Sequence, residues 1–336
     1  ANLFEEYPFA DEKYGHAQFG WGGGMEHTTV SFMGSFNRNL VAHELAHQWF
    51  GNKITCGSWK DIWLNEGFAT YLSGLVVENL DDNAAFKSWK QARNNSITSA
   101  TNGAVYLTDS DTTSVNRIFN SRLSYNKGSM VLHMLRKKLG DTDFFQGMKD
   151  YLADTNFAYG YAKTENYKAI MEAASGENLT DFFDDWIYNQ GYPSYTVEWS
   201  LPSTNMIRFK LNQVQSHPSV SFFEALVTVR IHGTGGEMQD EILVHTFDGE
   251  TFDRSVTFNV ASVEFDPEAD LISKDNTVLL GVEDFTFTPD LKLIPNPASN
   301  LVTIIKPTNL IIQKITIYNM LGQNLGTSLN QEKIDV

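Results

Sequence analysis

The stretch His43-Glu44-Leu45-Ala46-His47 decides how the rest of the chain is interpreted. The residues around it, 38–51, keep a helical pattern of apolar positions without a proline. Residues four apart share one face of a helix, so the two imidazoles point at one spot and form half of a zinc site. Glu44 lies about 100° around the helix from His43, beside the expected metal, where a general base would stand.

A catalytic zinc ion needs a third protein ligand and an open fourth position for water. The candidate is Glu66, in the stretch 63–71, which reads Trp-Leu-Asn-Glu-Gly-Phe-Ala-Thr-Tyr. Eighteen residues separate it from His47, which suits a helix end, a loop at 53–60 and the start of a second helix. The alternative is that these side chains lie on the surface of a core helix and bind nothing.

A glycine-rich stretch, Trp21-Gly22-Gly23-Gly24, precedes the two histidines. Glycine has no Cβ, so a ligand can approach this backbone closely. Glu26, at the mouth of such a loop, could hold a cationic group, or it could be a solvated acid in a turn. His27 could ligate a metal, but a hydrogen bond to substrate or to the loop backbone is the preferred interpretation.

These motifs together resemble the gluzincin aminopeptidases of the aminopeptidase N family. Besides the histidine motif and its distant glutamate, Gly23-Gly24-Met25-Glu26-His27 resembles the family's Gly-x-Met-Glu-Asn element, with His27 in place of the usual Asn. Tyr125-Asn126-Lys127-Gly128 resembles its Tyr-x-Lys-Gly element. The four motifs follow the family's order, and the resemblance covers roughly residues 5–285 in outline.

The resemblance implies roles for these residues in peptide hydrolysis. His43, His47 and Glu66 would hold one Zn²⁺, with Glu44 as the general base and acid. Glu26 would bind the free α-amine of the substrate, with Gly23, Gly24, Met25 and His27 along the peptide backbone. Tyr125 would donate a hydrogen bond to the oxyanion, although a tyrosine on a helix is by itself more typical of packing.

The expected fold class is α+β in several domains. Residues 1–193 are predicted to form a mostly helical, thermolysin-like catalytic domain whose N-terminal part is missing, because family members have further domains before the first motif. Expected helices include 121–139, 143–153, 164–174 and 180–189, with a long surface loop at 94–116. Residues 194–282 predict a β-sandwich from strands at 196–199, 206–211, 225–231, 242–247 and 256–260.

Residues 282–290 read as a linker, and residues 290–336 as a small β domain. Pro295-Asn296-Pro297-Ala298 and the later Tyr318-Asn319-Met320-Leu321-Gly322-Gln323 resemble the C-terminal sorting domain of type IX secretion in Bacteroidetes. The resemblance implies a secreted or cell-surface protein that meets the secretion machinery. An immunoglobulin-like adhesive module is the alternative.

The composition limits the function classes. With 41 acidic and 25 basic residues among 336, the formal net charge is −16, so nucleic acid and anionic membranes would on average be repelled. No apolar run approaches the ~20 residues of a membrane span. A single cysteine, Cys56, excludes an internal disulfide and is interpreted as a loop residue rather than a nucleophile.

The sequence therefore predicts a zinc aminopeptidase acting on peptides with a free N-terminus. Two alternatives stay open. A zinc endopeptidase would share the histidines but use no amine anchor. A surface-displayed binding or adhesion protein could carry an inactive peptidase domain. Asp61 and Thr70, which flank Glu66, are candidates for hydrogen bonds to the metal ligands.

Overall fold

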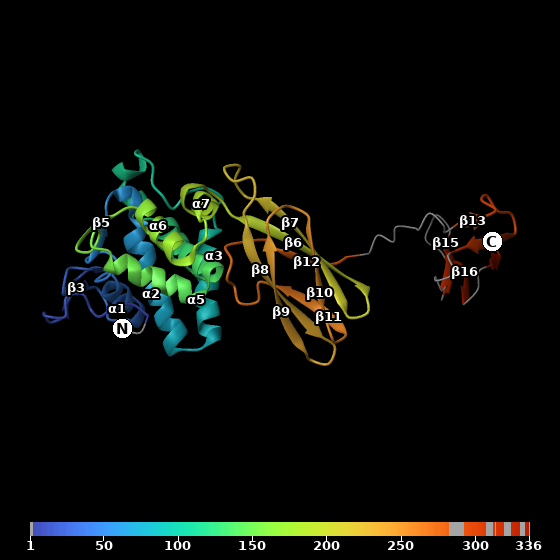
Figure 1. Cartoon of the computed structure of the whole chain (residues 1–336), viewed down its shortest axis with the longest axis horizontal. Helices are drawn as coiled ribbons and strands as arrows, with labels where there is room; N and C mark the ends of the chain where they lie inside the picture. Colours follow the sequence, from blue (N-terminus) through green and yellow to red (C-terminus); the bar gives the residue numbers. More distant parts are fainter. Residues whose placement is uncertain are drawn as a thin grey trace. The chain divides into compact units, whose positions relative to one another are not determined.

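The computed structural model describes residues 3–281, 292–306, 312, 314–318, 324–329 and 333–335. The chain divides into two compact units, residues 1–281 and 282–336. The first unit contains a helical lobe followed along the chain by a β-sandwich (Figure 1). Among the described residues, no helix is both long and apolar enough to cross a membrane.

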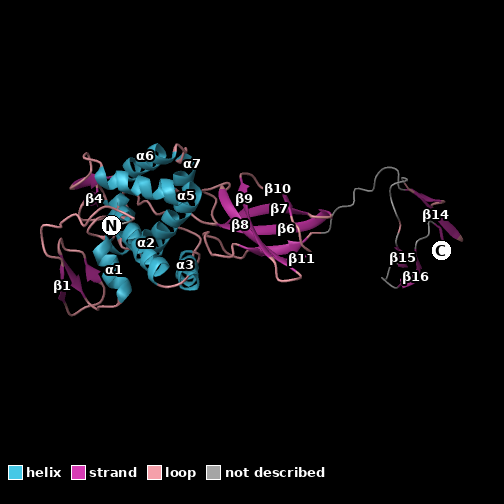
Figure 2. Cartoon of the chain, turned by 60° about the horizontal axis from the view of Figure 1, so that its bottom comes forward, coloured by secondary structure: helices cyan, strands magenta, loops and turns pink. Residues whose placement is uncertain are grey.

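The helical lobe is built around the helix α2 (Trp63–Leu80). Its longer helices are α1 (Arg38–Ala46), α2 (Trp63–Leu80), α3 (Asn83–Ile97), α5 (Gly128–Ala153) and α6 (Thr164–Ser175). Figure 2 shows them gathered in one region, with the long strands of the sandwich beside it. Most of α2 is buried, including Phe68 and Tyr71, which are fully enclosed. A mainly apolar helix can be buried on nearly all sides. The polar residues that α2 also buries include Asn65, Glu66 and Thr70.

Small strands support the lobe near the site. A three-stranded sheet has the order β1-β3-β2, from β1 (Gly15–Gln18), β3 (Val30–Met33) and β2 (Gly24–Met25). The segment expected as a loop at 53–60 contains β4 (Ile54–Cys56), which pairs in parallel with β5 (Gly160–Ala162). The other short helical segments are η1 (Trp59–Asp61), η2 (Asp111–Thr113), α4 (Val115–Ile118), α7 (Thr180–Phe183) and η4 (Asp184–Tyr188).

Two expectations for the lobe need correction. The helix expected at 121–139 begins as a π-helical segment, η3 (Ser121–Lys127), and then continues as α5 through a kink at Gly140, whose φ is 77°. The segment 94–116 is not wholly a surface loop. α3 extends to Ile97, and Leu107 is fully buried, with its amide donating to the carbonyl of Lys60 over 3.2 Å.

The sandwich contains two sheets, of order β10-β7-β6-β12 and β11-β8-β9. Its strands are β6 (Pro193–Ser203), β7 (Met206–Gln215), β8 (Ala225–Gly233), β9 (Met238–His245), β10 (Glu250–Ser255), β11 (Val260–Phe265) and β12 (Thr277–Leu280). The expected strand at 256–260 is wrong, because most of that segment is the connection between β10 and β11. Val256 is buried there, and its alternation with the partly buried Phe258 and Val260 gave the connection its strand-like pattern.

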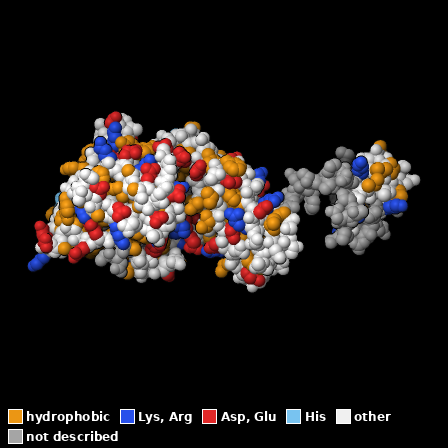
Figure 3. All heavy atoms as spheres, in the orientation of Figure 1, with side chains coloured by type: hydrophobic (Ala, Val, Ile, Leu, Met, Phe, Trp, Pro, Cys, Tyr) orange, Lys and Arg blue, Asp and Glu red, His pale blue; other side chains and the backbone are white. Residues whose placement is uncertain are grey.

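The second unit contains short strands: β13 (Lys292–Ile294), β14 (Leu301–Ile305), β15 (Lys314–Tyr318), β16 (Asn324–Leu329) and β17 (Lys333–Asp335). They pair as β13-β14-β17 and β15-β16. The expected linker at 282–290 and residues 319–323 of the tail motif lie outside the described residues. On the face of the first unit drawn in Figure 3, acidic, basic and apolar side chains are interspersed.

Candidate metal centre and active-site cavity

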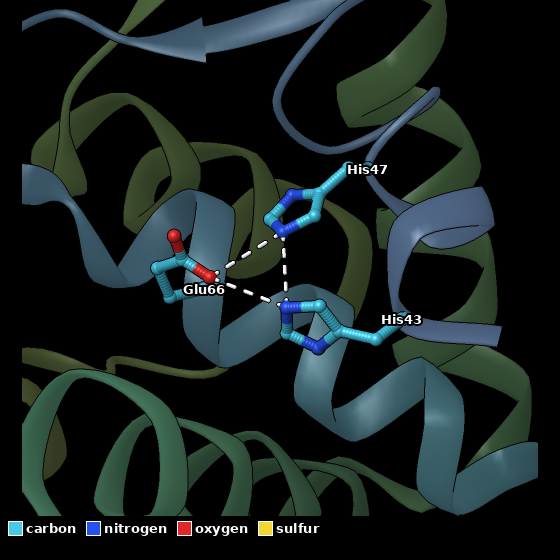
Figure 4. A group of neighbouring side chains, drawn as sticks. All are labelled: His43, His47 and Glu66. Carbon is cyan, nitrogen blue, oxygen red and sulfur yellow. Dashed lines mark hydrogen bonds and ion pairs between the residues drawn. The ribbon is translucent and has the colours of Figure 1, made fainter. Parts of the chain in front are cut away.

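Helices α1 and α2 bring three potential metal ligands together. His43 Nε2 and His47 Nε2 are 3.1 Å apart, and each lies 3.3 Å from Glu66 Oε2 (Figure 4). Three donors thus converge on one point, which is the arrangement that a shared cation would need. Two imidazole nitrogens and a carboxylate oxygen are a donor set used by catalytic zinc. The residues present therefore fit Zn²⁺.

The local fold explains how the second histidine is oriented. α1 ends at Ala46, five residues before the expected limit of the helical pattern, but His47 keeps helical angles (φ −57°, ψ −22°) and so remains one turn from His43. The chain then turns at Gly51, whose φ is 144°. This turn puts the carbonyl of Phe50 3.0 Å from His47 Nδ1, which can donate to it and leave Nε2 for the metal.

Two glutamates of the site have opposite electrostatic environments. Burial alone would raise the pKa of Glu66, but the charge on His47 and hydrogen bonds from both imidazoles lower it to about 2. Burial raises the pKa of Glu44 to about 7, and the charge of His47, which acts in the opposite direction, offsets this only in part. A carboxyl group with a pKa near neutrality is suited to accept a proton and to return it. β2 also approaches closely here, since a Cβ at Gly24 would overlap the Glu44 carboxylate.

Tyr125 lies on the π-helical segment η3 and faces the metal ligands. Its ring stacks on His43, with centroids 6.0 Å apart and an interplanar angle of 14°. Burial, and next the charge of Glu66, raise the pKa of the Tyr125 phenol well above its usual value. The phenol therefore keeps its proton and can donate a hydrogen bond.

Two glycines set the spacing between Tyr125 and Glu66. Gly67 directly follows the glutamate on α2, and Gly128 begins α5. A Cβ built on either glycine would lie 3.1 Å from the Cα of the other. The backbones of α2 and α5 are therefore in contact at the site, which gives a physical reason for a glycine directly after Glu66 and for the glycine that ends Tyr125-Asn126-Lys127-Gly128.

The ligands open into a cavity of about 430 Å³. Gly23, Gly24 and Glu26 line one part of it, and Glu26 also lies close to Glu44 and His47, with potential donor atoms of the three within 4.8 Å of one another. Met25 lines an adjoining cavity of about 560 Å³. His27 lines neither cavity, and its ring packs edge-on against Phe32 at 4.8 Å.

Other expectations meet different outcomes in the structure. Asp61 accepts from the amide and hydroxyl of Thr164 at 2.9 and 2.7 Å, and no hydrogen bond joins it to the histidines. Thr70 lines the cavity. Burial raises the pKa of the Cys56 thiol to about 12, so the thiolate form is disfavoured. Arg93 also lines the cavity, and no sequence motif signals it.

Comparison with known proteins finds a protein family whose sequence model matches the part of the chain that holds this site. Residues 27–186 match the Peptidase family M1 domain. Aminopeptidase N of Lactococcus lactis subsp. lactis is 37% identical over 165 residues, which cover 47% of this chain and 19% of that protein. Probable aminopeptidase 2 of Sulfurisphaera tokodaii is 35% identical over 210 residues, which cover 58% of this chain and 25% of that protein.

A solved structure shows the same fold over a longer stretch. Legionella pneumophila aminopeptidase A, in complex with aspartic acid, superposes with a TM-score of 0.65 at 15% identity, covering 80% of this chain and 32% of that one. This chain spans about a fifth to a quarter of the length of the curated relatives named above. The three convergent donors, His43, His47 and Glu66, lie within residues 27–186, the part of the chain that matches the M1 peptidase domain. This donor set is one that zinc metallopeptidases use.

Proposed function

We propose that this chain is a zinc aminopeptidase that removes residues from the N-terminus of peptides. The observation that carries the proposal is Glu26, an acid in the same cavity as Glu44, Glu66 and the two histidines. A carboxylate at this place binds the protonated α-amine of a peptide and so fixes the first peptide bond over the metal ligands. An enzyme that cleaves within a chain has no use for such an anchor.

The chain's own residues supply the remaining steps. When bound by His43, His47 and Glu66, Zn²⁺ supplies Lewis acidity and makes water acidic enough to react at neutral pH. Glu44 takes a proton from the attacking water and passes it to the leaving amine. Tyr125 donates a hydrogen bond to the oxygen of the scissile carbonyl as negative charge develops there.

The test compares an alanyl anilide with its N-acetylated form, using zinc-loaded protein. We expect hydrolysis of the free amine only, and we expect Glu26→Gln to reduce kcat/KM for it, since one charged hydrogen bond is lost. Equal cleavage of internal bonds in N-acetylated peptides would establish the endopeptidase alternative. Zinc binding without any turnover would favour the inactive binding protein.

We also propose that residues 290–336 act as a type IX sorting domain and that the protein is secreted or displayed at the cell surface. The support is the resemblance of the tail motifs. The test is expression in a Bacteroidetes host, behind an export signal, of the full chain and of a chain ending at residue 281. Only the full chain should reach the medium or cell surface. Equal export of both would contradict the proposal and leave the adhesive-module alternative.

A further inference from the structure

Arg93 brings an unpaired positive charge into the active-site cavity. It lies on α3 and lines the cavity together with the metal ligands, Glu26 and Tyr125. Among the described residues, its one hydrogen bond is from Nη1 to the carbonyl of Trp89 at 3.3 Å, and its Nε is buried without a partner there. Within the described part of the chain, Arg93 forms no ion pair with an acidic side chain.

The guanidinium is held in place from one side. Its Cζ lies 4.0 Å from the centroid of the Trp89 ring, a cation–π contact. The indole can occupy this place because α2 has a glycine opposite it: a Cβ at Gly74 would lie 2.6 Å from Trp89 Cζ2. Stacking uses the face of the guanidinium and leaves its in-plane N–H groups free of the ring. Since Nε is buried and Nη1 donates to the carbonyl of Trp89, the N–H groups of Nη2 are the ones available to an anion. A carboxylate accepts such charge-assisted hydrogen bonds.

The charges of the cavity explain why such a residue would matter. Three carboxylates line it, from Glu26, Glu44 and Glu66. Among the described residues that line the cavity, Arg93 alone carries a permanent positive charge. Burial lowers the pKa of Arg93 to about 10, so it stays charged at neutral pH. A partly buried cation without a counter-ion is unfavourable, and an anionic ligand would offset that cost. A carboxylate elsewhere in the cavity would instead be repelled.

We propose that Arg93 binds a carboxylate of the peptide substrate and gives the enzyme a preference for peptides that place one there. This inference rests on the aminopeptidase function proposed above. The carboxylate has two possible sources with the same chemistry. It is the free C-terminus of a short peptide, or it is an acidic side chain near the N-terminus of a longer one.

The test measures selectivity rather than total rate. For the zinc-loaded full chain, kcat/KM is determined for Ala-Ala, Ala-Ala-Ala and Ala-Ala-Ala-Ala, each as the free acid and as the C-terminal amide, and for Ala-Asp-Ala-amide and Ala-Ala-Asp-amide. At one length we expect the acid to exceed the amide by about tenfold, as a charged hydrogen bond gives. A preference for an Asp-containing amide instead would identify the acidic side chain as the source.

Two variants connect the preference to Arg93. Arg93→Gln should bring the acid-to-amide ratio to about one. Lys87→Gln removes a positive charge from the same helix, outside the cavity lining, and should keep the ratio of the unchanged protein. Equal rates for all acids and amides, or a preference that survives in Arg93→Gln, would overturn the proposal and leave Arg93 as a packing residue on Trp89.

A binding measurement separates this proposal from the proposed function. In Glu44→Gln, whose turnover should be too slow to consume the peptide during the measurement, calorimetry should show that the preferred acid binds about tenfold more tightly than its amide. Addition of Arg93→Gln should remove the difference. If the unchanged protein hydrolyses nothing yet this difference is found, the aminopeptidase function fails while the carboxylate site stands. If neither peptide form is favoured, the site fails.

Discussion

The helical lobe and the β-sandwich handle charged residues in opposite ways. In the lobe, Glu44, His47 and Glu66 are 3%, 1% and 6% exposed and surround a cavity. In the sandwich, charged residues pair at the surface, as in the forked contacts of Arg208 with Asp253, and the strands bury mainly apolar side chains such as Val227 and Ile231. The comparison teaches that buried charge gathers around the cavity of the lobe, while the interior of the sandwich is packed mainly with apolar side chains.

At the junction of the two regions, charged side chains are buried, as they are in the lobe. Asp270, from the connection between β11 and β12, accepts hydrogen bonds from Lys90 and, at 2.8 Å, from His133 Nε2. Lys137 lies 3.0 Å from its other oxygen. The acid and two of its partners are buried. Buried charge therefore also joins the regions, and the predictions below separate its chemical use from its structural use.

The largest effect is expected from Glu66→Ala, which removes a metal ligand. Zinc content should fall from one ion per chain towards zero, and hydrolysis should become undetectable. The loss of affinity should exceed the roughly 10–100-fold typical of losing a group that only supports a ligand. Metal analysis after dialysis measures it, and Glu198→Ala in β6 should keep the ion. Retention of stoichiometric zinc by Glu66→Ala would refute the ligand assignment.

A second large effect is expected from Glu44→Gln, which removes the proton relay but no ligand. The turnover number should fall by about 10²–10⁴-fold, the range of a general acid–base group. Zinc content should stay the same. Steady-state kinetics on the alanyl anilide, with metal analysis of the same sample, gives both values. Near-normal turnover would mean that another group moves the proton.

Asp270→Asn tests the buried charge at the junction. The variant leaves Lys90 buried without its carboxylate, so the free energy of unfolding should fall by about 3–5 kcal/mol, as for other broken buried pairs. Urea denaturation measures the change. A loss below about 1 kcal/mol would show that the junction behaves like the sandwich surface.

The same carboxylate should make stability depend on pH. Burial alone would raise the pKa of Asp270, but the hydrogen bond from His133 and the charge of Lys90 hold it well below its usual value. The stabilisation that ionised Asp270 gives the folded state is therefore complete above about pH 3.9, the pKa of an aspartate in the unfolded chain. It is lost as the pH falls further. Between about pH 5 and 3, Asp270→Asn should lose stability less steeply than the unchanged chain. Parallel curves would contradict this origin.

The smallest effect is expected in the sandwich. Asp253→Asn breaks the exposed pair with Arg208, whose side chains are 47% and 44% exposed. Pairs in such solvated positions contribute about 0–1 kcal/mol, so the unfolding free energy should change by no more than that. Denaturation under the conditions used for Asp270→Asn makes the comparison direct. A loss as large as that of the junction variant would end the contrast between the two regions.

The parts of the site that depend on local geometry were predictable. Helical periodicity alone places His43 and His47 on one face, because their spacing requires only one turn of helix. Tyr125 needed a family resemblance, since a tyrosine on a helix is usually a packing residue. Arg93 could not be predicted, because its place in the cavity depends on how Trp89 packs against Gly74. That contact joins two helices and leaves no pattern in either one.

The fold likewise divides into parts that local sequence patterns predict and parts that depend on contacts between distant residues. The long strands β6, β7 and β8 follow from alternating side chains. The connection at 256–260 has the same alternation, with Val256, Phe258 and Val260 turned inward, yet most of it is not a strand. Leu107 is buried in a cluster with Ile62 and Ile118, and its amide donates to the carbonyl of Lys60, far away in sequence. Local patterns fail where tertiary contacts decide the outcome.

The meeting of Gly67 with Gly128 has a consequence for how this reaction centre can vary. Because main chain touches main chain there, no rotamer change can absorb an added methyl group. Alanine at either position would separate the two helices by some tenths of an ångström and would move Glu66 away from the phenol of Tyr125. The distance between the Glu66 carboxylate and the Tyr125 phenol, which come from distant parts of the chain, thus depends on two residues that have no side chain.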